Sequence, residues 1–149
     1  MRFGHWILGV GLVLGLGGGL AGSSGEARAQ DTPMSDVNCD TAETQAELDT
    51  CASLDFQAAD SDLDAAYRAA MARLQAIDEA LPQDEQGAVA ALVAAEQAWI
   101  AFRDQACAAE GFTVHGGSME PMVVMECRTR LSAARAEDLW SLSESASDP

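Results

Sequence analysis

The chain has 149 residues, of which 24 are acidic and 8 are basic, and its formal net charge is −16 at pH 7. An acidic surface of this kind repels nucleic acid and anionic lipid and favours cationic partners, although charge also keeps a generic exported protein soluble. There is no lysine, and the arginines after residue 30 alternate with acids, which argues against a nucleic-acid-binding patch.

The first 29 residues are typical of a secretory signal peptide. Arg2 precedes an apolar run that begins at Trp6, and Ala27-Arg28-Ala29 is an A-x-A cleavage site. Cleavage there would leave one domain of 120 residues, and the loss of Glu26 and two arginines leaves 23 acids and 6 arginines, a net charge of −17. No later stretch is apolar enough to span a membrane, so we expect a periplasmic or secreted protein.

Four cysteines in an exported chain predict two disulfides, with three possible connectivities. We favour Cys39–Cys51 and Cys107–Cys127, each of which would stabilise the fold by roughly 3 kcal/mol. A zinc site is the alternative, but a single histidine follows Ala29 and no C-x-x-C pair occurs. We therefore expect neither a metal nor a cofactor.

Residues 30–43 are polar and are expected to be flexible. Thr44-Gln-Ala-Glu47 has the pattern of a capping box, in which each side chain bonds the other residue's backbone N–H, and it predicts a helix start. From there to about Ile77, apolar residues recur at spacings of three and four, which predicts one long amphipathic helix.

The segment Asp60-Ser-Asp62-Leu-Asp64 resembles the start of a calcium-binding EF-hand loop. Ala65 and Met71 stand where that loop needs glycine and glutamate, so we place these carboxylates on the helix instead. Asp60, Asp64 and Tyr67 then share one edge of its face. Asp62 is then expected to be a solvated charge, and Asp60 is a candidate partner for Arg103 that would fix how the first two helices meet.

A connection that contains Pro82 follows, and the second helix is expected from about Asp84 to Glu110. One stripe of this helix recurs at spacings of three and four and is expected to face the core; it comprises Leu92, Ala95, Trp99, Phe102 and Ala106. Arg103 and Asp104 lie beside that stripe.

Gly111 to Gly117 forms the second connection, and Gly116-Gly117 predicts a turn within it. Ser118 is expected to cap a third helix, with Pro121 in its first turn. The inner face of that helix is expected to include Cys127, Leu131, Ala134 and Leu142, and residues 143–149 form a polar tail. These elements predict an all-α fold, a three-helix up-down-up bundle over residues 44–142 that two disulfides staple.

No motif predicts an active site. His115 lies close to Ser118, but no G-x-S-x-G motif occurs, and no acidic residue stands at a telling spacing from the histidine. A polar loop histidine is therefore favoured over an envelope enzyme that uses His115. Met119, Met122 and Met125 share one side of the third helix, where they either fill the core or form an adaptable contact surface.

The order of these motifs resembles the LprI-type lysozyme-inhibitor family of small exported domains. The matching pieces are Thr44-Gln-Ala-Glu-Leu-Asp-Thr-Cys51-Ala, Ala59-Asp60-x-x-Leu63-Asp64-x-x-Tyr67, Ala98-Trp99-Ile-Ala-Phe-Arg103-Asp104-x-x-Cys107, Gly116-Gly-Ser-Met-Glu-Pro-Met122 and Cys127-x-x-x-Leu131-x-x-x-Arg135-x-x-x-Leu139. The chain departs from the family pattern at Asp64, where asparagine is usual, and at Gln97, where a basic residue is common.

The resemblance implies an exported helical domain and, for the family's namesake, inhibition of lysozyme. We therefore expect a binding protein and not an enzyme, which blocks a cationic muramidase by loop insertion. The candidate partner-binding residues are His115, Ser118, Met119, Glu120 and Met122. In this hypothesis His115 and Ser118 donate to the catalytic carboxylates of the muramidase, and Met119 fills an apolar subsite.

The alternative is a structural or adaptor module of the cell envelope that has no affinity for lysozyme. Its contact surface would be the methionine-bearing end or the acidic helix faces. The sequence leaves the oligomeric state open.

Overall fold

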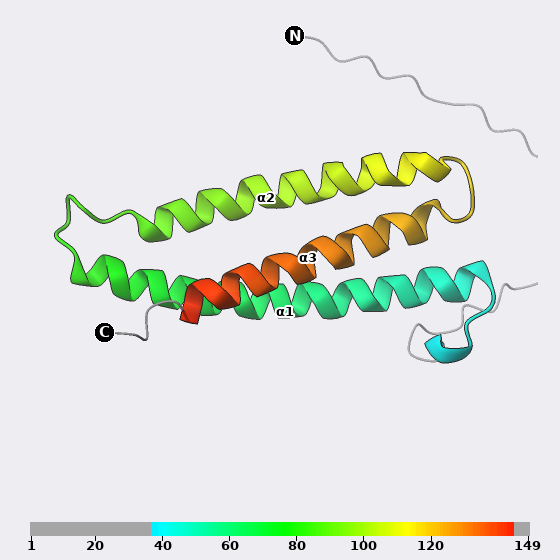
Figure 1. Ribbon diagram of the computed structural model, residues 1–149, viewed down its shortest axis with the longest axis horizontal. Coiled ribbons are helices and arrows are strands. Elements are labelled where there is room, and N and C mark those ends of the chain that lie inside the picture. Colours follow the sequence, from blue (N-terminus) through cyan, green and yellow to red (C-terminus); the bar gives the residue numbers. More distant parts are fainter. Residues whose placement is uncertain (1–36, 145–149) are drawn as a thin grey trace, which may run out of the picture. The chain divides into compact units, whose positions relative to one another are not determined.

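The computed structural model describes residues 37–144, whose regular structure is entirely helical (Figure 1). The elements are η2 (Cys39–Thr41), α1 (Gln45–Ala80), α2 (Ala88–Gly111), η3 (Phe112–Val114) and α3 (Glu120–Glu144). The predicted signal peptide, the first residues of the predicted flexible segment and the last five residues of the predicted tail lie outside the described residues.

The three long helices form the predicted all-α up-down-up bundle. In Figure 1, α1 and α3 run in the same direction. α2, which lies between them in the sequence, runs antiparallel to both. α3 packs most extensively on α1, whereas α1 and α2 approach each other least. Between residues 37 and 144, no helix combines the length and the apolar character that crossing a membrane requires.

The start of α1 confirms the predicted capping box. The Thr44 hydroxyl accepts a hydrogen bond from the Glu47 backbone N–H at 3.3 Å, and the Glu47 carboxylate accepts from the Thr44 N–H at 2.9 Å. These bonds satisfy N–H groups that the first turn of a helix leaves without partners. The Thr44 backbone N–H, followed by its hydroxyl, lowers the pKa of Glu47 below its ordinary value.

Both predicted disulfides are present. Cys39–Cys51 ties the short turn η2 to α1, with the Cα atoms 5.6 Å apart. Cys107–Cys127 joins α2 to α3 with a Cα separation of 5.4 Å, and both of its cysteines are buried. One bridge therefore fixes the entry to the bundle and the other fixes the α2–α3 hairpin.

The second helix begins later than predicted, at Ala88 and not near Asp84. The Asp78 carboxylate, in the last turn of α1, accepts hydrogen bonds from the backbone N–H groups of Gly87, Ala88 and Val89 at 2.9–3.0 Å. The cap of α2 thus comes from the preceding helix across the connection. A local reading cannot find such a cap, because sequence rules search for it at the helix end itself.

The buried face of α2 differs from the predicted stripe. Leu92 is buried as expected and Trp99 is partly buried against the core, but Ala95 is exposed and Phe102 is 60% exposed. The buried residues of α2 are Leu92, Glu96, Arg103, Cys107 and Gly111. The prediction was wrong because two charged residues face inward, each with an ion-pair partner on another helix.

The inner face of α3 is also rotated from the predicted one. Its buried residues are Cys127, Ser132, Ala136 and Leu139, whereas Ala134 is exposed and Leu142 is 37% exposed. At the α1–α3 contact, Ala66, Ala70 and Ala136 are fully buried. Small side chains at these positions let the two helices pack closely around a few leucines.

The corrected faces can be tested with two substitutions on different helices. Leu139 is 1% exposed, so Leu139→Ala is expected to lower the free energy of unfolding by about 2–5 kcal/mol. Phe102→Ala is the control and is expected to change it by less than about 0.5 kcal/mol, because the ring is mostly in solvent. Urea denaturation followed by circular dichroism measures both. A larger loss in the free energy of unfolding for Phe102→Ala would mean that Phe102 faces the core, as the sequence predicted.

The capping role of Asp78 gives a second test. The three N–H groups, first that of Gly87, lower the pKa of Asp78 below its ordinary value of 3.8. The carboxylate therefore stabilises the fold above that value, and this contribution is lost as the pH falls through the lower pKa of the folded state. Asp78→Ala is expected to reduce the melting temperature at neutral pH. Asp84→Ala, in the same connection, is the control and is expected to leave it unchanged.

Candidate functional site

The α2–α3 tip, defined here as residues 111–122, is a compact corner between two stapled helices. Gly111 is the last residue of α2 and packs against α3. A Cβ atom at this position would lie 2.6 Å from Val124 Cγ2, so the two helices approach each other where no side chain would fit. Gly116 has a φ of 75°, a conformation that favours glycine and confirms the predicted turn. α3 begins at Glu120, later than the predicted cap at Ser118 implies.

Glu120 organises the turn that precedes it. Its carboxylate accepts a hydrogen bond from the Gly116 backbone N–H at 2.8 Å and lies 3.1 Å from Nδ1 of His115. The Gly116 N–H, followed by the His115 side chain, lowers the pKa of Glu120 below its ordinary value. The expectation that no acidic residue stands beside His115 was wrong, because the turn brings together residues five apart in sequence.

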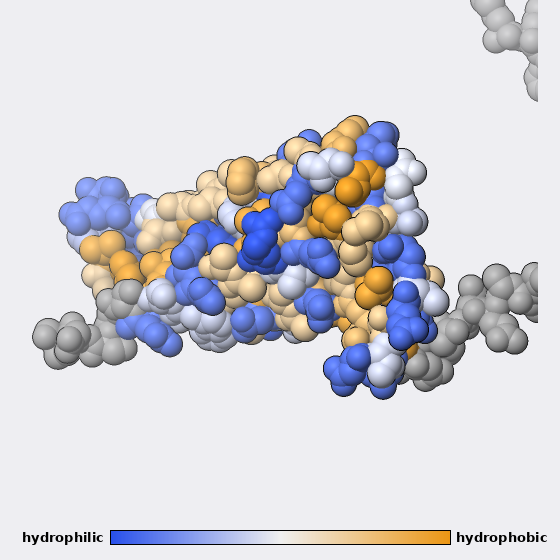
Figure 2. All heavy atoms as spheres, turned by 45° about the vertical axis from the view of Figure 1, so that its right-hand side comes forward, coloured by the Kyte–Doolittle hydropathy of each residue, from blue (hydrophilic) through white to orange (hydrophobic). Residues whose placement is uncertain are grey.

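The tip presents large side chains to solvent. Phe112 is 65% exposed and stacks on the His115 ring, with the centroids 4.7 Å apart. Met119 is 46% exposed, whereas Met122 is half-buried, with its sulfur 3.9 Å from Nε2 of Gln45 on α1. In Figure 2, which turns this end of the bundle forward, apolar residues gather next to polar ones.

The methionines of this end therefore divide between the two predicted roles. Met119 faces outward, and Met122 and Met125 are half-buried against the bundle.

Ser118 is exposed and makes no hydrogen bond within residues 37–144, so it does not cap α3 in the way that the sequence predicted. Phe112 was not among the sequence candidates, although its place beside a helix-ending glycine was a signal of an exposed corner.

Behind the tip, two links hold α2 and α3 together. The Cys107–Cys127 disulfide is buried, and Arg130 of α3 donates to the Glu110 carboxylate of α2 at 2.8 Å. The exposed rings are thus carried on a corner that the covalent bridge keeps in place. A rigid corner loses little conformational entropy when it binds a partner.

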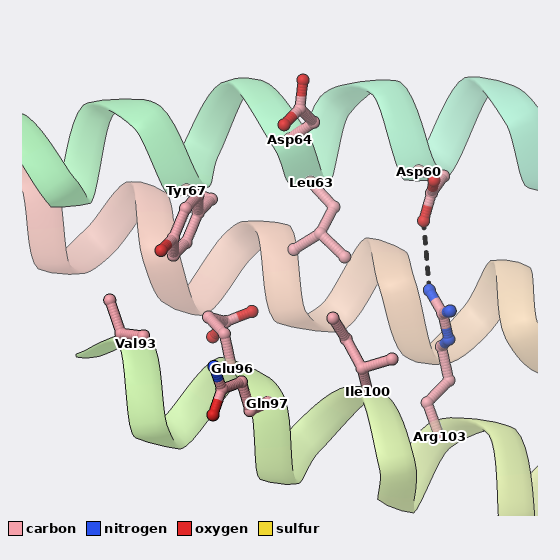
Figure 3. Close-up of a pocket in the computed structure, with 9 residues that line it drawn as sticks. All are labelled: Asp60, Leu63, Asp64, Tyr67, Val93, Glu96, Gln97, Ile100 and Arg103. Carbon is pink, nitrogen blue, oxygen red and sulfur yellow. Dashed lines mark hydrogen bonds and ion pairs between the residues drawn. The ribbon is translucent and has the colours of Figure 1, made fainter. Parts of the chain in front are cut away.

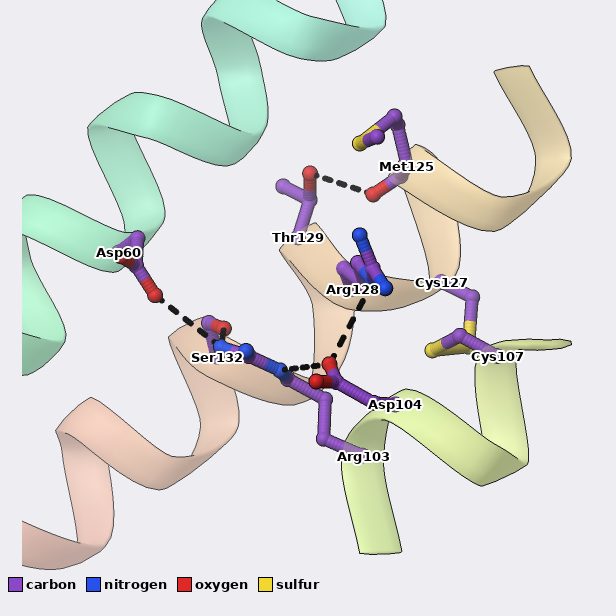
Figure 4. Close-up of polar contacts among 9 residues, drawn as sticks. All are labelled: Asp60, Arg103, Asp104, Cys107, Met125, Cys127, Arg128, Thr129 and Ser132. Carbon is purple, nitrogen blue, oxygen red and sulfur yellow. Dashed lines mark hydrogen bonds and ion pairs between the residues drawn. A yellow bond between two sulfur atoms is a disulfide. The ribbon is translucent and has the colours of Figure 1, made fainter. Parts of the chain in front are cut away.

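Arg103 lies deeper in the bundle and confirms the predicted pair with Asp60. Its guanidinium donates to Asp60 of α1 at 3.0 Å, to Ser132 of α3 at 3.2 Å and to the neighbouring Asp104 at 3.1 Å (Figure 4). It also lies 5.4 Å from the ring centroids of Phe56 and Trp99. These contacts join all three helices, which makes Arg103 a structural residue.

A second ion pair, partly buried, joins α2 to α3. Nε of Arg135 donates to the Glu96 carboxylate at 2.8 Å, and a further nitrogen of the same guanidinium contacts the same oxygen. The sequence did not predict this pair or the burial of Ser132, because charged and hydroxyl residues that lie among alanines are normally predicted to face solvent. Tyr67, by contrast, packs against the core from α1, as its place on the helix face predicted.

The aspartates of the rejected EF-hand pattern lie on α1. Asp62 accepts from the Trp140 indole at 3.2 Å, and Asp64 pairs with Arg68 one turn along. Within residues 37–144, no group of three or more histidine, cysteine or acidic side chains is arranged to hold a metal ion.

The profile of a family described as "Lysozyme inhibitor LprI" matches residues 36–139. The chain belongs to the LprI family. An uncharacterized protein of Rhizobium meliloti is 42% identical over 112 residues, which cover 73% of this chain and 81% of the relative. No solved structure matches. The LprI match extends from the residues before the first disulfide to Leu139, so it covers both bridges, the Arg103 contacts and the α2–α3 tip.

The Glu120 carboxylate provides a pH test of the tip. Because its pKa is lowered, its bond to Gly116 is expected to persist below the ordinary value of 4.5 and to be lost as the pH falls through the folded-state pKa. The Gly116 amide resonance in NMR spectra should therefore shift with a midpoint below 4.5. Glu120→Gln should abolish that transition, and Glu126→Gln, on the exposed side of α3, should preserve it. A midpoint above 4.5 would contradict the bond.

Proposed function

We propose that this protein is an exported inhibitor that binds a cationic muramidase and inserts the α2–α3 tip into its substrate cleft. The observation that carries the proposal is the tip itself, which exposes the Phe112–His115 stack and Met119 on a corner that a buried disulfide holds. Membership of the LprI lysozyme-inhibitor family supports the choice of target.

The chemistry of the tip fits a cleft that binds a sugar chain around two catalytic carboxyl groups. Nδ1 of His115 faces Glu120, and the ring is exposed, which leaves Nε2 to make a polar contact with the enzyme. The Ser118 hydroxyl is exposed and supplies another donor. The Phe112 ring and the Met119 side chain offer apolar area for the walls of sugar subsites.

The charge of the chain supports a basic partner. A net charge of −16 on a small protein attracts a cationic enzyme over a distance and speeds their encounter. Such attraction is screened by salt, whereas contacts made by the tip are not. Charge therefore contributes mainly to the association rate, and the contacts of the tip contribute to the lifetime of the complex.

The test is a muramidase assay with the oxidised protein against c-type, g-type and i-type lysozymes at two salt concentrations. We expect stoichiometric inhibition of one type, weakened at the higher salt concentration. Phe112→Ala and the double variant His115→Ala/Ser118→Ala are each expected to raise the inhibition constant at least tenfold, as for residues at the centre of an interface. Phe102→Ala, an equally exposed ring outside the tip, is the matched control and should change it less than twofold.

Inhibition that none of the tip variants alters would place the contact elsewhere on the molecule. Absence of inhibition at micromolar excess of the folded protein would favour the alternative, a cell-envelope adaptor. That protein should then capture an endogenous envelope partner through the exposed apolar residues of the same tip.

A further inference from the structure

A groove of about 430 Å³ lies between α1 and α2, within the size range of small-molecule sites. In Figure 3, Leu63 reaches down from α1 towards Ile100 of α2, and Tyr67 and Val93 continue the lining along the same two helices. Its walls are mainly apolar and carry a few polar groups, which is the composition of a ligand site. The groove follows from the limited contact between α1 and α2.

The most informative polar group in the groove is Glu96. Its side chain is only 10% exposed, and both nitrogens of Arg135 that contact it share one oxygen, Oε1. Among residues 37–144, none donates a hydrogen bond to the second oxygen, Oε2. A carboxylate oxygen in such a poorly hydrated place is a strong acceptor for a charged donor.

Tyr67 places a second polar group on the opposite wall. Figure 3 shows its hydroxyl pointing from α1 towards α2, on the side of Glu96 and Gln97. Within the part of the chain that the structure describes, this hydroxyl has no hydrogen-bond partner. An amine that bonds Glu96 therefore finds a neutral acceptor across the groove.

The donors and acceptors of the lining select the kind of ligand. Each of its three carboxylates has an arginine partner: Asp60 pairs with Arg103, Asp64 with Arg68 and Glu96 with Arg135. The Arg103 donors are directed to Asp60, Asp104 and Ser132, so they are not available to an anionic ligand. Oε2 of Glu96 remains as an acceptor for a charged donor.

We propose that the α1–α2 groove binds a small organic cation, a primary ammonium group on a short apolar body. The ammonium donates to Oε2 of Glu96 and to the Tyr67 hydroxyl, and the apolar body covers Leu63, Val93 and Ile100. A free amine is the occupant because the space is that of a small-molecule site. The site is separate from the α2–α3 tip, so the proposal stands without muramidase inhibition.

The test is an NMR titration of the full-length exported protein with hexylammonium, using hexan-1-ol as the neutral control with the same apolar body. We expect shifts centred on the groove residues and a millimolar dissociation constant, as is reasonable for a ligand of so few atoms. Hexan-1-ol is expected to bind about tenfold more weakly, because it cannot form the charged bond to Glu96. Equal affinity for the two probes, or no shift at high millimolar concentration, would overturn the proposal.

Variants locate the site. Ile100→Trp fills the groove from a position that is 46% exposed and should abolish binding, whereas Phe102→Ala on the outer side of the same helix should leave it unchanged.

Two further variants test the polar groups. Tyr67→Phe should weaken the binding of hexylammonium about threefold without affecting that of hexan-1-ol. Glu96→Gln should weaken the amine at least tenfold. Because this change also disturbs Arg135, Ile100→Trp and Tyr67→Phe decide the question if that variant does not fold. Binding that survives Ile100→Trp would contradict the assignment.

Discussion

The bundle depends on the burial of the Arg103 guanidinium. A buried cation must recover the hydrogen bonds that it loses with water, and here the acceptors come from Asp60 on α1, Ser132 on α3 and Asp104 on its own helix. The rings of Trp99 and Phe56 complete its surroundings. Because these partners lie on three helices, only one rotation and one register of α2 satisfy them together.

That rotation explains the uneven packing of the three helices. With Arg103 and Glu96 turned inward, α2 is attached to its neighbours by ion pairs and a disulfide as well as by Leu92 and Trp99, whereas α1 and α3 pack through fully buried alanines. Phe102 is consequently left in solvent on the opposite side of α2. The α1–α2 groove is part of the same arrangement, because long charged side chains keep two helices further apart than alanines do.

The α2–α3 tip combines covalent anchoring with exposed apolar side chains. The Cys107–Cys127 bridge holds the two helices, Gly111 lets them approach closely, and Glu120 fixes the turn through Gly116 and His115. Exposed rings on a preorganised corner are the features of a binding surface in which little freedom is lost on association. The negative charge of the chain would act at longer range on a cationic partner, and would make its association faster and dependent on salt.

The sequence by itself determined the three helices and the capping box at Thr44, because these rest on local spacing. It also favoured both cysteine pairs and offered the Asp60–Arg103 contact as a candidate, because each was one of a small set of pairings. Tertiary structure alone decided the cap that Asp78 gives to α2, the outward turn of Phe102 and the burial of Ser132 and Glu96. The physical reason is that a polar side chain is buried only when a partner on another helix satisfies it, and hydrophobic periodicity carries no information about that partner.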